Sequence, residues 1–274
     1  MTSFGERLQV AVDAHGPLCV GIDPHSVLLR AWGLPESPEG VRSFGLAVVE
    51  AAAGRLAVVK PQVAFFERFG AAGIAVLEEI IRVARATGLL VIADAKRGDI
   101  GSTAEAYGAA WLAAGAPLRS DALTLAPYVG LGALEAVIDI GRTAGNGVFV
   151  LAATSNPEGR ELQASLDGTG ETVAGRIAQD AAARNASAAG WGDIGLVIGA
   201  TQPLAVTGID PTRLARTPIL APGFGAQGAR LGELGALFGA AAGTVIPSVS
   251  RSVLGAGRDG LVAAIESHRT ELTR

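Results

Sequence analysis

Eight short apolar runs recur along the chain, and a stretch with helical patterning follows each of them. The runs are rich in Val, Ile and Leu and nearly continuous in hydrophobicity, which is typical of parallel strands covered on both faces. They span residues 18–22, 56–59, 89–93, 122–125, 148–152, 195–198, 218–220 and 244–246. The helical stretches include residues 65–87, 131–143 and 172–189, and a short helix is expected within 203–216.

This alternation of strands and helices predicts an α/β fold, the (β/α)8 TIM barrel. The chain has 274 residues, and one such barrel typically needs about 250. No linker or low-complexity segment divides the sequence, so we expect a single catalytic barrel domain over residues 1–274. A doubly wound open sheet is the alternative architecture.

Composition and charge narrow the class of protein. Hydrophobic residues make up 49% of the chain, enough for a large core, and the formal net charge is −4 with no basic stripe. Proteins that bind nucleic acid usually carry such a stripe, so none is expected as a partner. No apolar run suggests a membrane span, and the N-terminus lacks the apolar core of a signal peptide. The one cysteine, Cys19, is interpreted as a core thiol, and a cytoplasmic protein is expected.

Lysine is rare in this chain. Of 22 basic residues, two are Lys (Lys60 and Lys96), which leaves 20 Arg. Both lysines stand at the ends of apolar runs. Arg carries a broad, planar guanidinium group, whereas Lys carries a compact ammonium group that can give up a proton. A requirement for Lys at these two positions is indicated, with chance retention at buried positions as the alternative.

In a (β/α)8 barrel, the chemistry lies at the carboxyl ends of the strands. Almost every apolar run here ends in a polar or Gly-rich group. These groups are Asp23, Lys60, Asp94 with Lys96, Thr124 with Pro127, Thr154 with Ser155, Gly199 with Thr201, residues 222–228 and residues 248–252.

The largest cluster of charged residues follows the third apolar run, residues 89–93. Asp94 and Lys96 are two residues apart and so share one face of a strand, whereas Asp99 follows three residues later. On the neighbouring strand, Pro61 forces Lys60 into an extended conformation. Opposite charges that alternate in a partly buried site keep each other ionised. An ordinary salt-bridge network that closes the barrel is the structural alternative.

This cluster suits a decarboxylation that needs no metal and no redox cofactor. A carboxylate beside the carboxylate of a substrate disfavours the ground state or, on another view, belongs to a field preorganised for the transition state. An adjacent ammonium then stabilises the developing carbanion and protonates it. The three histidines, His15, His25 and His268, are too dispersed to suggest a metal site.

A phosphate site is predicted after the last two strands, where these barrels commonly bind phosphate. Residues 222–228, Pro-Gly-Phe-Gly-Ala-Gln-Gly, follow the seventh run, and residues 248–252 follow the eighth and are expected to open a helix. Glycines permit close approach of the backbone, a helix N-terminus offers N–H groups, and Arg251 supplies a bidentate cation.

These motifs together resemble the orotidine 5′-phosphate decarboxylase family, and in particular its longer bacterial subgroup, called mycobacterial-type or type 2. The pattern D-x-K-x-x-D-I-x-x-T occurs as Asp94, Lys96, Asp99, Ile100 and Thr103. The G-I-D-P motif is residues 21–24, the second-strand lysine is Lys60, the P-G-x-G-A-Q-G loop is residues 222–228, and the final arginine is Arg251. One departure is Arg97-Gly98, where a hydrophobic pair is commoner in the family.

The resemblance implies a cofactor-free decarboxylation of orotidine 5′-phosphate (OMP) to UMP and CO2 in a homodimer, the last step of de novo UMP synthesis. Lys96 would protonate C6 of the pyrimidine, Asp94 would face the substrate carboxylate, and Lys60 and Asp99 would complete the array. Asp99 and Thr103 would reach the neighbouring subunit's site. Contacts with the ribose, the pyrimidine and the phosphate would come from Asp23, Lys60, Thr103, Ser155, Gln227 and Arg251. Thr154 could serve instead of Ser155.

Two other functions remain open at this point. One is a Mg²⁺-dependent sister activity on the same scaffold, such as 3-keto-L-gulonate-6-phosphate decarboxylase or hexulose-phosphate synthase, which resemble this chain in D-x-K-x-x-D. Those enzymes would normally have an acidic residue at the position of Lys60. The other is an inactive barrel that acts as a ligand sensor or assembly protein.

Overall fold

The computed structural model describes residues 2–272 and forms a closed barrel of eight parallel strands. Each strand pairs with its sequence neighbours, and β8 closes the ring against β1. The strands are β1 Cys19–Ile22, β2 Val58–Pro61, β3 Leu90–Arg97, β4 Ala122–Leu125, β5 Gly147–Ala153, β6 Ile194–Ile198, β7 Ile219–Pro222 and β8 Val245–Val249. The predicted (β/α)8 barrel is confirmed, and the open sheet is wrong.

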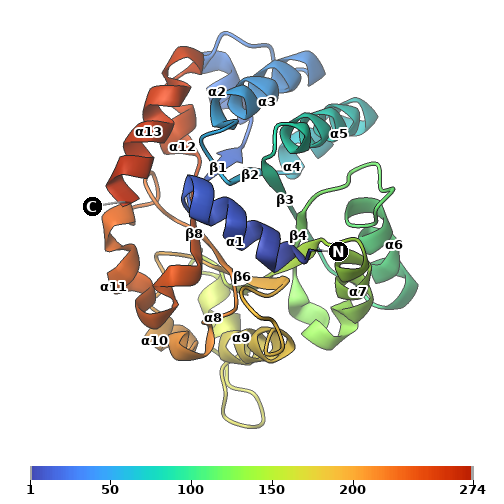
Figure 1. Cartoon of the computed structure of the whole chain (residues 1–274), viewed down its shortest axis with the longest axis vertical. Coiled ribbons are helices and arrows are strands. Elements are labelled where there is room, and N and C mark those ends of the chain that lie inside the picture. Colours follow the sequence, from blue (N-terminus) through green and yellow to red (C-terminus); the bar gives the residue numbers. More distant parts are fainter. Residues whose placement is uncertain (1, 273–274) are drawn as a thin grey trace.

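A ring of helices surrounds the barrel (Figure 1). The α-helices are α1 Phe4–His15, α2 Ser26–Ala31, α3 Pro38–Ala52, α4 Ala64–Glu67, α5 Gly70–Ala86, α6 Gly101–Trp111, α7 Glu135–Thr143, α8 Gly159–Gln163, α9 Val173–Arg184, α10 Leu204–Thr207, α11 Leu234–Phe238, α12 Arg251–Leu254 and α13 Leu261–Leu272. Within residues 2–272, no helix is both long enough and apolar enough to cross a membrane.

The inside of the barrel changes from apolar to polar along the strand direction. Side chains on a strand alternate between its faces, so every second residue points inward. The apolar inner layer is formed by Cys19, Val58, Leu90, Ile92, Ala122, Phe149, Val197, Leu220 and Ile246. Two residues further along four of these strands stand Lys60, Asp94, Thr124 and Ser248, all buried. The same alternation that fills the core therefore carries polar groups into the barrel mouth.

Helix α1 closes the opposite end of the barrel and lies across the centre of the helix ring in Figure 1. Ser3 caps this helix by accepting a hydrogen bond from the Glu6 backbone N–H at 3.2 Å. Phe4 and Leu8 are fully buried in the inner layer. A Cβ at Gly147, the first residue of β5, would lie 2.2 Å from the Phe4 ring, so glycine is required there. This closure leaves one open end for a site.

The structure departs from the sequence predictions at element ends. Strand β3 runs four residues past the predicted run, so Asp94 and Lys96 lie within the strand. Ser248 likewise belongs to β8. The predicted helix 65–87 is divided into α4 and α5. The predicted helix 172–189 ends at Arg184, and the C-cap residue Asn185 donates through its side chain to Ile194 O at 2.7 Å.

Candidate active site

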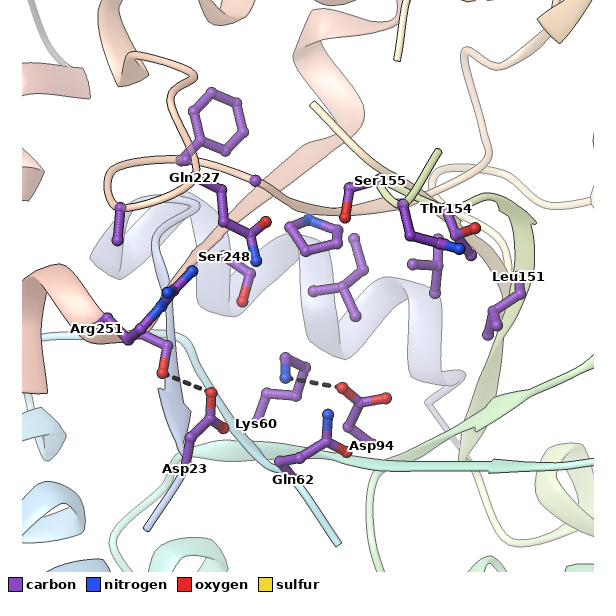
Figure 2. Close-up of a pocket in the computed structure, with 18 of the residues that line it drawn as sticks. Asp23, Lys60, Gln62, Asp94, Leu151, Thr154, Ser155, Gln227, Ser248 and Arg251 are labelled. Atoms are coloured by element: carbon purple, nitrogen blue, oxygen red, sulfur yellow. Dashed lines mark hydrogen bonds and ion pairs between the residues drawn. The ribbon is translucent and has the colours of Figure 1, made fainter. Parts of the chain in front are cut away.

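A cavity of about 430 Å³ opens at the carboxyl ends of the strands. Eight of the residues named individually from the sequence line it, together with further members of the predicted segments 222–228 and 248–252: Asp23, Lys60, Asp94, Lys96, Thr154, Ser155, Gln227 and Arg251. Figure 2 shows Gln227 and Arg251 on one side, Ser155 and Thr154 on another, and Asp23, Lys60 and Asp94 along the base. The structure therefore brings together residues from six different strands and their following loops.

Asp94 lies between the two lysines of the chain. Its Oδ2 accepts a hydrogen bond from Lys60 Nζ at 2.9 Å, and its Oδ1 accepts one from Lys96 Nζ at 2.6 Å. The side chains of Lys60 and Asp94 are 8% and 11% exposed, whereas that of Lys96 is 43% exposed. Lys60 is thus held in the floor of the cavity, and Lys96 is the ammonium that an incoming molecule can reach.

The backbone at Lys96 is unusual. Its φ is +49°, and within residues 2–272 it is the one non-glycine residue with a positive φ. Such a conformation costs on the order of 1–3 kcal/mol and occurs mainly at functional sites. The pairing of β3 with β4 shifts register between Ala93 and Arg97, which is the same segment. The expected i, i+2 relation of Asp94 and Lys96 therefore holds through a locally distorted strand.

Burial and charge act in opposite directions on this array. Burial alone would lower the pKa of Lys60, but the carboxylates of Asp94 and Asp23 outweigh it, and the pKa is raised. Burial alone would raise the pKa of Asp94, but Lys60 and Lys96 reverse the effect and lower it. Lys60 and Asp94 are therefore both ionised at neutral pH.

Asp23 follows β1 at the edge of the cavity. Its Oδ2 accepts a hydrogen bond from Ser250 Oγ at 2.5 Å, whereas its Oδ1 is buried without a hydrogen-bond partner. A buried acceptor of this kind is costly unless a donor reaches it. A hydroxyl of a bound molecule would supply that donor.

The loop after β7 and the segment after β8 form the end of the cavity that holds Gln227 and Arg251. Gly223, Gly225 and Gly228 have φ values of +117°, +69° and +110°, which favour glycine. A Cβ at Gly225 would lie 2.7 Å from Ser252 Oγ, so the two segments touch closely. The predicted helix after β8 is a four-residue turn, α12, and Arg251 is its first residue. The groups that can bind an anion here are therefore the Arg251 guanidinium and the backbone of residues 222–228, and not the N-terminus of a long helix.

Ser155 and Thr154 differ in their surroundings. Thr154 Oγ1 accepts a hydrogen bond from Gln163 Nε2 at 2.8 Å, and the Thr154 N–H donates to Gln163 Oε1 at 3.0 Å. Figure 2 shows the Ser155 hydroxyl directed toward the cavity. Ser155 is therefore the better placed of the two to contact a bound molecule.

Asp99 and Thr103 are not among the residues that line the cavity. Asp99 Oδ1 accepts from the Ile100 N–H at 2.8 Å, just before α6, and Thr103 is exposed on that helix. A Cβ at Gly98 would lie 2.4 Å from Ala126 O, which explains the glycine that precedes Asp99.

The contacts of three residues in the site, Gln62, Ser250 and Thr124, were not assigned from the sequence. Gln62 lines the cavity and lies with its Oε1 3.5 Å from Lys96 Nζ. It stands two residues after Lys60, so the strand period could have indicated it. Ser250 binds Asp23, and Thr124 contacts both Asp94 and the Lys96 backbone. Across residues 2–272, no three His, Cys, Asp or Glu side chains are grouped so as to hold a metal ion.

The chain is similar to known proteins over nearly its whole length. A sequence model of the orotidine 5′-phosphate decarboxylase / HUMPS family matches residues 16–266. An orotidine 5′-phosphate decarboxylase of Streptomyces coelicolor is 51% identical over 265 residues, which cover 94% of this chain and 92% of that protein. Its counterpart in Salinispora arenicola is 51% identical over 267 residues, covering 97% and 94%.

One solved structure has nearly the same fold. It is a crystal structure from Streptomyces avermitilis, described as an orotidine 5′-phosphate decarboxylase, with a TM-score of 0.95 and 48% sequence identity. The match covers 100% of this chain and 95% of that one. The barrel, the site geometry and these similarities lead to one conclusion: the chain belongs to the orotidine 5′-phosphate decarboxylase / HUMPS family.

Proposed function

We propose that this protein decarboxylates OMP to UMP and CO2, the final step of de novo UMP synthesis. The observation that carries the proposal is the position of Asp94, which accepts hydrogen bonds from both Lys60 and Lys96 at the floor of the cavity. A substrate carboxylate placed beside Asp94 would meet like charge, while the carbanion that replaces it would meet ammonium. This arrangement favours the transition state over the ground state.

The chemical step needs one proton and one bond cleavage. The bond between C6 and the substrate carboxylate breaks, its electron pair stays on C6, and CO2 leaves. The Lys96 ammonium transfers a proton to C6, and the resulting amine regains a proton from solvent. Lys96 suits this role because its side chain is 43% exposed and Asp94 holds it at 2.6 Å.

Substrate binding follows from the three sides of the cavity. The phosphate would lie between Gln227 and Arg251, where a guanidinium can bind it bidentately. The ribose hydroxyls would lie near Lys60 and Asp23, whose buried Oδ1 needs a donor. Ser155 would hydrogen-bond the pyrimidine. Binding energy from the distant phosphate would then be available to hold C6 against Lys96.

The proposed enzyme is a homodimer in which Asp99 and Thr103 serve the neighbouring subunit's site. Both residues lie outside their own cavity, and two large apolar side chains are exposed on the segments that hold them or pack against them: Ile100 is 60% exposed, and Tyr128, two residues after the Ala126 that contacts Gly98, is 85% exposed. Large exposed apolar side chains that gather near functional residues favour a partner surface. A cytoplasmic location is part of the same proposal, since the single cysteine can form no intrachain disulfide.

The test is an absorbance assay of OMP conversion by the purified protein, run with and without a metal chelator. We expect OMP loss with equal formation of UMP, unchanged by the chelator. Lack of turnover would reject the proposal in favour of an inactive barrel. Activity on a keto-sugar phosphate that the chelator abolishes would favour the Mg²⁺-dependent sister reaction.

A further inference from the structure

Thr124 lies beneath Lys96 at the inner face of β4. It is 1% exposed, so it cannot contact bulk solvent, and it is one strand away from Asp94. Its Oγ1 accepts a hydrogen bond from the Lys96 backbone N–H at 2.9 Å and lies 3.1 Å from Asp94 Oδ1. One hydroxyl thus touches both the backbone of the proton donor and the carboxylate that holds its ammonium.

The roles of donor and acceptor in this contact are fixed by chemistry. A threonine hydroxyl has one proton to donate, and the Lys96 N–H can only donate. The hydroxyl proton can therefore go to Asp94 Oδ1 at 3.1 Å or to Ala93 O at 3.5 Å. The ionised carboxylate is both the closer and the stronger acceptor, because charge-assisted hydrogen bonds are stronger than neutral ones.

The segment that Thr124 contacts is the distorted one. Lys96 has the positive φ, and the register of β3 on β4 shifts between Ala93 and Arg97. The Lys96 N–H is directed at a side-chain oxygen in this segment, in place of a regular ladder partner. The N–H of the residue with the unusual backbone is thus bound by a side-chain acceptor on β4.

We propose that Thr124 is a positioning residue for the decarboxylation. Its hydroxyl holds the left-handed Lys96 backbone and orients Asp94 Oδ1, so that Lys96 Nζ is kept at one point above the cavity floor. This inference rests on the proposed function. If Thr124 only packed the core, a side chain of the same volume could replace it. A positioning residue also requires the hydroxyl oxygen.

The test compares Thr124→Val, which keeps the volume and removes the hydroxyl, with Thr124→Ser, which keeps the hydroxyl. We expect Thr124→Val to lower kcat by about 10- to 100-fold, since small misplacements of a reacting group have effects of that size. KM and the Kd for UMP should stay within about threefold, and Thr124→Ser should retain most of kcat. Thr124→Ala should lose kcat as Val does and serves if the Val variant does not fold.

Either of two kinetic outcomes would overturn the inference: wild-type kcat in Thr124→Val, or a loss in Thr124→Ser as large as in Thr124→Val. A crystal structure of the Val or Ala variant gives a readout without turnover, and we expect a changed φ at Lys96 or a longer distance from Lys96 Nζ to Asp94. An unchanged segment would contradict the inference. If the wild-type protein fails to convert OMP, the proposed function fails, and this structural readout still tests whether Thr124 holds Lys96.

Discussion

Asp94 Oδ1 lies 2.6 Å from Lys96 Nζ, although the two residues are separated by one position on a strand whose backbone turns left-handed at Lys96. The Lys96 ammonium therefore lies beside a carboxylate of the same strand. The opposite carboxylate oxygen is bound by Lys60 at 2.9 Å, so the Lys60–Asp94–Lys96 part of the charged array is formed within one chain before any substrate arrives. Preorganisation of this kind is the principal means by which an enzyme without a cofactor can stabilise a carbanion.

Arg251→Ala should raise KM for OMP by about 10- to 100-fold, because a charge-assisted pair with the phosphate would be lost. Arg251→Lys should recover part of the affinity, since it keeps the charge but not the planar fork. Arg42→Ala is the matched control, as Arg42 is exposed and pairs with Glu79 on the outer helices. Steady-state kinetics measures the KM for OMP of each variant. An unchanged KM in Arg251→Ala would exclude Arg251 from the phosphate site.

The pKa of Asp94 predicts an acid dependence of stability. Lys60 and Lys96 hold this pKa below its usual range in the folded state, so near pH 4 the unfolded chain binds more protons at this residue. The stabilisation is fully present above about pH 5 and is lost as the pH falls below the unfolded pKa of about 3.9.

Denaturant unfolding of the wild type and of Asp94→Asn between about pH 3.5 and 7 measures this dependence. We expect the difference in free energy of unfolding to be about 3–5 kcal/mol at neutral pH, the range found when one partner of a buried ion pair is removed, and to shrink in acid. Asp13→Asn, at an exposed position on α1, is the control and should show little difference. If the difference in free energy of unfolding between the wild type and Asp94→Asn stays constant or grows in acid, the lowered pKa of Asp94 is contradicted.

Mixing two inactive variants tests the shared site. In a heterodimer of Lys96→Ala with Asp99→Asn, one site would combine Lys96 of one subunit with Asp99 of the other and so be intact. After subunit exchange at equal concentrations, about a quarter of wild-type activity should return, because half of the dimers are mixed and each has one intact site. If Asp99 serves its own cavity instead, both sites stay defective and no activity returns.

The barrel could be predicted from the sequence because continuous apolar runs have a direct physical cause, burial on both strand faces. Lys60, Asp94 and Lys96 could be predicted because their spacing follows the strand period and lysine is otherwise missing from the chain. The link through Thr124 could not, since it depends on a register shift between β3 and β4 that no local pattern encodes. The division of helix 65–87 was also missed, because its apolar pattern continues across the break before Gly70, whose φ is +61°.

The most direct test of the account is OMP turnover by Lys96→Ala, measured in protein whose Kd for UMP has been determined. Loss of a general acid costs about 10²- to 10⁴-fold, and we expect a fall in kcat of at least that size with UMP still bound. Lys96→Arg should be similarly inactive, because it keeps the charge but cannot give up a proton. Turnover near the wild-type rate in Lys96→Ala would show that another group protonates C6 and would contradict the central claim.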